Sequence, residues 1–143
     1  MVAQSRNAKA WAAVQAVADD ERAPISIRHV VIASVRALGA TGAGLSLARG
    51  AGPREPVLAT APLFEDLEDL QFTVGVAPCS DAVAVGGPVL VPDLAGLEAG
   101  RRWPVFAPSA VERGMHGMFV FPVAAGAEGS LGGFFIPLAF LAY

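Results

Sequence analysis

The 143-residue sequence has little cysteine, and Cys79 is its one thiol. A single thiol excludes a disulfide within the chain and a thiolate metal cluster built by one chain. We therefore expect a protein of the reducing cytoplasm. The length compensates for the missing cross-links, because a chain of about this size buries roughly 68–70% of its extended surface and can form a core without a disulfide or a metal.

Long apolar runs are also absent. The most apolar stretch, Leu131 to Tyr143, is shorter than the ~20 residues that cross a bilayer. The first twenty residues lack the apolar centre of a secretory signal, since Lys9, Asp19 and Asp20 interrupt an alanine-rich helical pattern. We therefore expect neither a membrane partner nor a cleaved leader.

The sequence has no excess of basic charge. Ten Lys and Arg residues oppose 13 Asp and Glu residues, which gives a formal net charge of −3. A general nucleic-acid binder needs a basic surface to neutralise phosphates. We therefore expect no direct nucleic-acid partner.

Catalytic motifs are missing too. The sequence contains no H-E-x-x-H, no G-x-S-x-G, no P-loop lysine and no glycine-rich dinucleotide fingerprint between a strand and a helix. Its grouped carboxylates, Glu65, Asp66, Glu68 and Asp69, have a helical spacing that predicts a face pointing to water. A general acid needs burial to raise its pKa, so this face is not expected to supply one. We expect a non-catalytic protein, and the sequence requires no cofactor or metal.

What the sequence does contain is a regular succession of helical and strand patterns. The spacing of the apolar residues and the positions of Gly and Pro predict helices over Ser5 to about Glu21, Ile25 to Leu38, Leu63 to Phe72 and Trp103 to Arg113. The same signals predict strands over Gly42 to Ala48, Glu55 to Ala61, Pro88 to Val91, His116 to Val123 and Leu131 to Pro137. This order predicts an α+β domain with one antiparallel sheet. The first two helices are expected on one side of the sheet, and the middle segments on the other.

Two local signals refine this outline. The segment between the first two strands is rich in Gly and Pro and predicts a hairpin turn. Gly75 to Asp81 is predicted to be a loop that leads into a short helical turn, and Asp93 is predicted to be the N-cap of the turn that follows it.

Several short motifs, in order, carry a family resemblance. They are Leu70-Gln71-Phe72, Gly75-Val-Ala-Pro-Cys79 with Asp81-Ala82, Gly87-Pro88-Val89, Val91-Pro92-Asp93-Leu94, Arg102-Trp103-Pro104-x-Phe106, Gly114 and Phe119-Val-Phe-Pro-Val123. With them the chain resembles actinobacterial GAF domains over about Ile25 to Ile136. Val76 and Ala77 stand where that family has glutamate and glycine.

The resemblance implies a single GAF-like domain over residues 24–143, with an antiparallel sheet of five or six strands flanked by helices. Residues 1–23 are expected to form an N-terminal helix that is available for a dimer contact. The resemblance further implies a small-molecule pocket or its vestige, dimerisation through terminal helices, and sensing rather than catalysis. The signature of the cyclic-nucleotide-binding relatives is absent, which argues against cyclic GMP.

The expected pocket lies on the far side of the sheet from the first two helices. Its candidate ligand-binding residues are Phe72, Cys79, Asp81, Arg102, Trp103, Phe106, His116 and Met118. Ligand sites are mostly apolar concavities with a few convergent polar groups, which this set could provide. The alternative is that the large side chains simply fill the core.

Individual residues also have two interpretations. Cys79, at the start of a short helix, is either a reactive thiolate or a small buried residue. His116 could bind haem iron or donate to a ligand, or it is structural. Arg102, next to Arg101, could clamp a carboxylate or phosphate, or it belongs to a solvated ion pair. His29 is expected to be a partly exposed helical residue.

The leading hypothesis is a cytoplasmic regulatory module that binds an unidentified small molecule. It would signal through homodimer contacts to an output partner protein in trans. The first alternative is a protein interaction domain with a filled pocket, in which Trp11, Val14 and the Phe140-Leu141 end supply a dimer surface. The second is a redox sensor based on Cys79.

Overall fold

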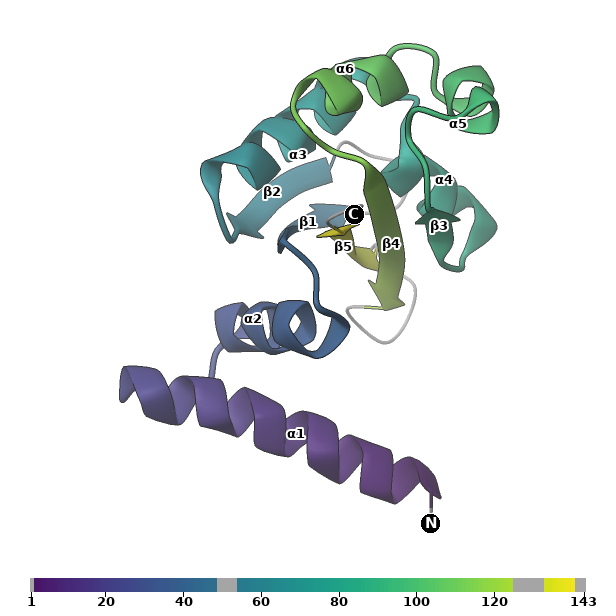
Figure 1. Cartoon of the computed structure of the whole chain (residues 1–143). Helices are drawn as coiled ribbons and strands as arrows, with labels where there is room; N and C mark the ends of the chain where they lie inside the picture. Colours follow the sequence, from purple (N-terminus) through teal and green to yellow (C-terminus); the bar gives the residue numbers. More distant parts are fainter. Residues whose placement is uncertain (1, 49–53, 125–132, 141–143) are drawn as a thin grey trace.

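The computed structural model describes residues 2–48, 54–124 and 133–140, which form an α+β fold (Figure 1). The helices are α1 (Val2–Glu21), α2 (Ile27–Leu38), α3 (Pro62–Val74), α4 (Pro78–Val85), α5 (Leu97–Arg102) and α6 (Phe106–Glu112). The strands are β1 (Gly42–Ala48), β2 (Arg54–Ala59), β3 (Val89–Val91), β4 (Gly117–Ala124) and β5 (Gly133–Phe140).

The predicted order of helices and strands is confirmed in outline, with three local differences. The helix α5 was not predicted, since only a turn was expected after Asp93. The predicted helix from Trp103 to Arg113 is instead α6 alone, because Trp103 ends α5 and Pro104 follows it. The residue before a proline disfavours the helical conformation, which explains the break. The last strand was predicted to stop at Pro137 and instead continues to Phe140.

The strands follow the order β2-β1-β5-β4-β3, and every pairing is antiparallel. The expected regular sheet of five or six strands needs correction. Four of the strands form two two-stranded antiparallel hairpins, β1 with β2 and β4 with β5, and β3 adds only three residues at one edge. No sixth strand lies within the described residues.

The seam between the two hairpins explains this division. The β1–β5 ladder pairs Gly42 with Ala139 and resumes at Ser46 with Phe135, and no pair is formed at Gly44, opposite Pro137. Proline has no backbone N–H to give to a ladder. A register shift between Leu45 and Ser46 also interrupts the β1–β2 pairing, so β1 is irregular along both of its edges.

One face of the sheet is covered by α2, where Val31 packs with Ala43 and Leu45 of β1. The expectation that the first two helices both cover this face is wrong, because α1 packs on α2, away from the sheet (Figure 1). Val14 and Val17 of α1 are buried in a separate cluster with Ala33. Among the α1 side chains that the structure describes, the buried ones lie in its second half.

The opposite face of the sheet is covered by α3, α4 and α6 and holds the main core (Figure 1). Two glycines of β1 let α3 approach closely. A Cβ at Gly42 would overlap the Phe64 ring and lie 2.7 Å from Thr60 Oγ1, and one at Gly44 would lie 3.0 Å from Glu68 Cγ. The side chains of α3 thus occupy the space that larger β1 residues would need.

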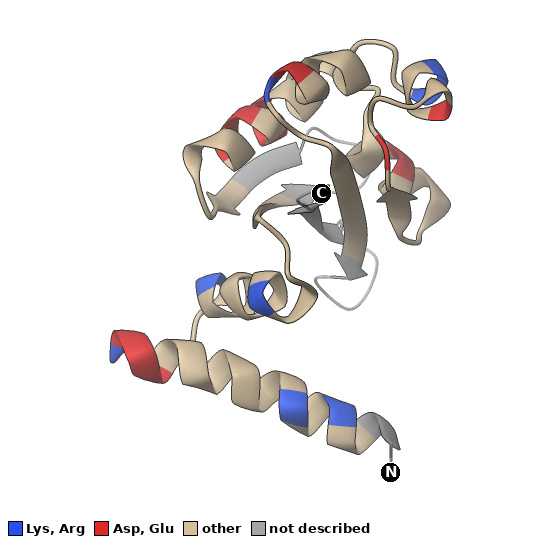
Figure 2. Cartoon of the chain, in the orientation of Figure 1, with Lys and Arg blue, Asp and Glu red and all other residues tan. Residues whose placement is uncertain are grey.

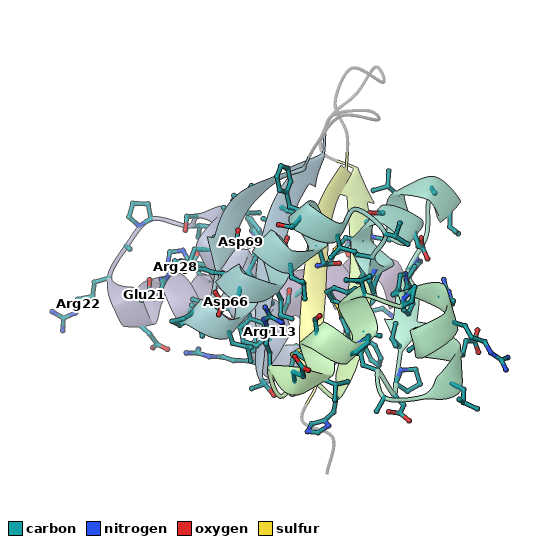
Figure 3. The ribbon with its side chains drawn as sticks, turned by 90° about the horizontal axis from the view of Figure 1, so that it is seen from above. Glu21, Arg22, Arg28, Asp66, Asp69 and Arg113 are labelled. Atoms are coloured by element: carbon teal, nitrogen blue, oxygen red, sulfur yellow. The ribbon has the colours of Figure 1, made fainter. Side chains whose placement is uncertain are left out.

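The junction of α1 and α2 is held by a polar cluster of Glu21, Arg28 and His29, of which Figure 3 labels the first two. Glu21 accepts hydrogen bonds from Arg28 and lies 2.7 Å from His29 Nε2. His29 Nδ1 accepts the backbone N–H of Ser26 at 3.0 Å, which caps α2. The prediction that His29 is partly exposed is wrong, since it is 3% exposed.

We expect this junction to make stability depend on pH. Hydrogen bonds from Arg28 and then His29 lower the pKa of Glu21 from 4.5. A depressed folded-state pKa stabilises the fold above the unfolded value, and that stabilisation is lost as the pH falls through the folded pKa. The stability lost through Glu21→Gln should therefore be largest above pH 4.5 and should shrink in more acidic solution.

Urea unfolding at a series of pH values measures this difference. Arg28→Gln removes the first of these partners, so the double variant should lose less than the sum of the two single losses near neutral pH. A Glu21→Gln effect that is equally large at every pH would contradict the interpretation.

Candidate functional site

A polar cluster on the α3 side of the sheet joins α4 to the end of α5. Asp81 Oδ2 accepts the indole N–H of Trp103 at 3.0 Å and an N–H of Arg102 at 3.2 Å. The Arg102 guanidinium also lies 4.4 Å from the centroid of the Trp103 ring. We call Asp81, Arg102 and Trp103 the Arg102 brace. Three of the predicted site residues are therefore brought together.

The brace holds a half-exposed cation in one orientation. Trp103 is 1% exposed, so its indole is a fixed support, and its N–H is satisfied by Asp81. A guanidinium stacked on an aromatic ring gains cation–π attraction while its edge stays available for hydrogen bonds. The Arg102 side chain is 41% exposed and can therefore meet a ligand from solvent.

Arg102 and Trp103 border a groove of about 300 Å³ between β3 and α5. We call this the β3–α5 groove. It is lined by Leu90, Val91, Pro92, Asp93, Gly96, Leu97, Glu98, Ala99, Arg102 and Trp103. Its walls are mainly apolar, and acidic and basic residues lie together on α5 (Figure 2). A concave apolar surface with a few polar groups has the make-up of a small-molecule site.

The turn between β3 and α5 shapes one end of the groove. Asp93 Oδ1 accepts the N–H of Ala95 at 3.0 Å, and the Asp93 carbonyl accepts the N–H of Gly96 at 3.2 Å. Asp93 thus caps the turn that follows it, as predicted, whereas the N-cap of α5 itself is Gly96. The capping signal of Asp93 is present in the sequence, whereas its position at the groove was not predicted.

The large predicted pocket residues lie in the main core. Cys79, Trp103, Phe106 and Met118 belong to one buried cluster, and none is more than 1% exposed. This arrangement favours the filled-core alternative for these four side chains. Two other candidates lie outside the cluster, because Phe72 is 55% exposed on α3 and His116 is exposed at the start of β4.

Buried polar groups lie beneath α3. Gln71 is fully buried, and its Oε1 accepts the backbone N–H of Cys79 at 3.1 Å. The prediction that all four grouped carboxylates point to water is wrong for Glu68, which is 4% exposed. The signal was present in the spacing, because Phe64, Glu68 and Gln71 follow each other at four and three residues along one helical stripe.

A second groove of about 300 Å³ lies between β2 and α3 and is lined by Val57, Leu58, Ala59, Glu65, Glu68 and Asp69. Figure 3 shows Asp69 on α3 together with Asp66. Within the described ranges, no group of three His, Cys, Asp or Glu residues is arranged to hold a metal ion. In the same ranges, no helix is both long and apolar enough to cross a membrane.

Comparison with known proteins gives one informative likeness. No protein-family model matches the chain, and no curated protein matches it. A solved structure from Sinorhizobium meliloti 1021, a domain of a protein assigned as a two-component sensor histidine kinase, is similar with a TM-score of 0.51 and 23% identity. The match covers 80% of this chain and 73% of that one.

This likeness shows a shared fold. At 23% identity it does not identify the ligand or the activity of this chain. The resemblance to actinobacterial GAF domains therefore stays a prediction.

Proposed function

We propose that the chain is a non-catalytic sensory or regulatory module that binds a small molecule in the β3–α5 groove. The observation that supports this most is the Arg102 brace, which fixes a half-exposed guanidinium at the border of a concave, mainly apolar surface. The shared fold with a domain of a protein assigned as a sensor histidine kinase agrees with a sensory role. We place the protein in the cytoplasm, as the lone thiol suggests.

The brace also provides a way to pass on the bound state. Arg102 closes α5, whereas Asp81 lies in the first turn of α4, which packs on β3 and β4. A ligand that draws Arg102 away from Asp81 would change how α5 is tied to α4. A ligand shifts an equilibrium only through unequal affinity for two conformations, which in this proposal are those with the Arg102–Asp81 ion pair formed and broken.

The groove residues support binding rather than turnover. Beside the carboxylates of Asp93 and Glu98, the lining contains no Ser, Thr, Cys, His or Lys that could act as a nucleophile or a general base. The Cys79 thiol is fully buried in the main core, which does not favour the redox-sensor alternative.

Amide spectroscopy of the labelled protein tests the proposed function. A mixture of small polar metabolites and amino acids should shift the amide signals of Leu90 to Trp103, and the shifts should saturate with concentration. Arg102→Gln should weaken that response about tenfold or more, because a charge-assisted hydrogen bond is lost. Arg101→Gln changes the neighbouring arginine, which does not line the groove, and should keep the response. If no compound shifts these signals, the proposal is wrong.

A second candidate function is a dimerisation module that acts through α1 and passes a signal to a partner protein. It is favoured by Trp11, which is 59% exposed on the half of α1 that no described element covers. Of the other residues predicted for this surface, Val14 is buried against α2, Leu141 lies outside the described residues, and the Phe140 side chain is not described either.

Light scattering after size exclusion tests the dimer. We expect the wild-type protein to have the mass of two chains and Trp11→Glu to have the mass of one, because a charge would enter an apolar contact. Gln4→Glu adds the same charge near the start of α1 and is the matched control. A wild-type monomer would exclude this function.

A further inference from the structure

We infer that the β3–α5 groove binds a free α-amino acid with an apolar side chain. This inference rests on the proposed function and names the class of ligand for the same groove. It follows from the position of the charged residues along the groove, from the N–H donors that Arg102 can still offer and from the apolar side chains of the lining.

The groove has acidic and basic groups at different ends. Asp93 and Glu98 lie by the N-terminal end of α5, whereas Arg102 closes its C-terminal end. Arg102 lies four positions after Glu98, which corresponds to a rise of roughly 6 Å along the helix. Among the described residues, Arg102 forms its ion pair with Asp81 and not with Glu98. The groove therefore offers an anionic end and a cationic end to one ligand.

An α-amino acid matches this pattern. Its ammonium and carboxylate groups share one carbon, and charge-assisted hydrogen bonds of about 2.8 Å at each group extend the span to roughly 8 Å. This span is of the same order as the rise of roughly 6 Å from Glu98 to Arg102. The ammonium would face Asp93 and Glu98, and the carboxylate would face Arg102.

The brace leaves Arg102 with donors for the carboxylate. A guanidinium has five N–H donors, and Asp81 takes one of them at 3.2 Å among the described residues. Stacking on Trp103 fixes the plane of the group, so less side-chain freedom is lost when a carboxylate binds. Bidentate pairing with a ligand carboxylate is therefore open to Arg102.

The same charges disfavour other ligand classes. A dianion would be repelled by Asp93 and Glu98, and a simple cation would be repelled by Arg102. A wholly apolar compound would remove water from these groups without replacing its hydrogen bonds. A zwitterion satisfies both ends at once.

The walls define the side chain of the ligand. Leu90 and Leu97 are 56% and 81% exposed at the groove, and Val91, Pro92 and Ala99 complete its apolar surface. A ligand side chain that covers them removes apolar area from water. The volume of about 300 Å³ lies at the lower end of ligand sites, which favours a single amino acid over a peptide.

Four probes separate the contributions in a calorimetric titration. L-Leucine has both charges and an apolar side chain, 4-methylpentanoate lacks the ammonium, 3-methylbutylamine lacks the carboxylate, and glycine lacks the side chain. We expect leucine to bind, and each of the other three to bind about tenfold more weakly or worse. Amide signals of Leu90 to Trp103 should report that leucine occupies the groove.

Variants assign the two charges. Asp93→Asn keeps an oxygen for the Ala95 N–H and removes the charge, so leucine should lose affinity while 4-methylpentanoate should not. Arg102→Gln should weaken the binding of leucine and leave the binding of 3-methylbutylamine unchanged. Because Arg102 also stacks on Trp103, Arg102→Lys provides a second test that retains the charge and should recover part of the leucine affinity. Asp66→Asn, on α3, is the control.

The outcomes distinguish this inference from the proposed function. If 4-methylpentanoate or 3-methylbutylamine binds the groove as tightly as leucine, the amino-acid class is wrong and the proposed ligand site stands. If leucine fails to bind while another compound shifts the groove amides, the same conclusion holds. If no compound shifts them, both proposals are wrong.

Discussion

Replacing Trp103 with alanine is expected to lower the free energy of unfolding by about 3–5 kcal/mol. Trp103 is among the largest fully buried side chains, and its indole packs in the main core beside Phe106 and Met118. The substitution leaves a cavity and also removes the N–H donor to Asp81. Without this support the Arg102 guanidinium loses its fixed orientation, so ligand response at the groove should be lost as well.

Denaturant unfolding at constant pH measures the first effect. Trp103→Phe keeps an aromatic ring and removes the N–H, so it should cost less than the alanine variant and still weaken the brace. Leu97→Ala, at an 81% exposed position of the same helix, should change stability by less than about 0.5 kcal/mol. A Trp103→Ala protein as stable as the wild type would show that α5 does not pack as described.

Replacing Gly42 with alanine is expected to cost about 1–3 kcal/mol, because a side chain enters a space that is already filled. The added Cβ would overlap the Phe64 ring and lie 2.7 Å from Thr60 Oγ1. Thr60 accepts the N–H of Ala43 at 2.9 Å, so a shift of Thr60 would also disturb the start of β1. The damage should be concentrated where α3 meets the β1–β2 hairpin.

Gly100 supplies the matched control. A Cβ added there would meet nothing within 4 Å, and the position lies inside α5. Gly100→Ala should therefore be neutral or stabilise the protein by about 0.4–1 kcal/mol, since it restricts the unfolded chain. Equal stability losses at Gly42 and Gly100, measured by the same unfolding experiment, would be inconsistent with the close approach of α3 to β1.

Much of the fold was predictable because its signals are local. The β1–β2 hairpin follows from two apolar runs around a Gly- and Pro-rich joint, and α2 ends at Gly39, whose φ of 64° suits glycine. The insertion of β5 between β1 and β4 was not predicted, since it joins residues far apart in the sequence. Its interruption opposite Pro137 depends on that register.

The site was predictable as a set of residues and not as an arrangement. Asp81, Arg102 and Trp103 were named from the sequence, but the hydrogen bonds that join them span more than twenty positions. Burial of a polar residue was missed at His29 and at Glu68 because both lie beside charged neighbours in the sequence. They are covered by other elements, α1 at His29 and β1 at Glu68, which a helical period does not reveal.

The most direct test of the account is a crystal structure of the protein grown with saturating L-leucine. We predict electron density for the amino acid between β3 and α5, with its carboxylate on Arg102 and its ammonium towards Asp93 and Glu98. Density in another part of the protein with the groove left empty, or no bound amino acid at all, would contradict the account.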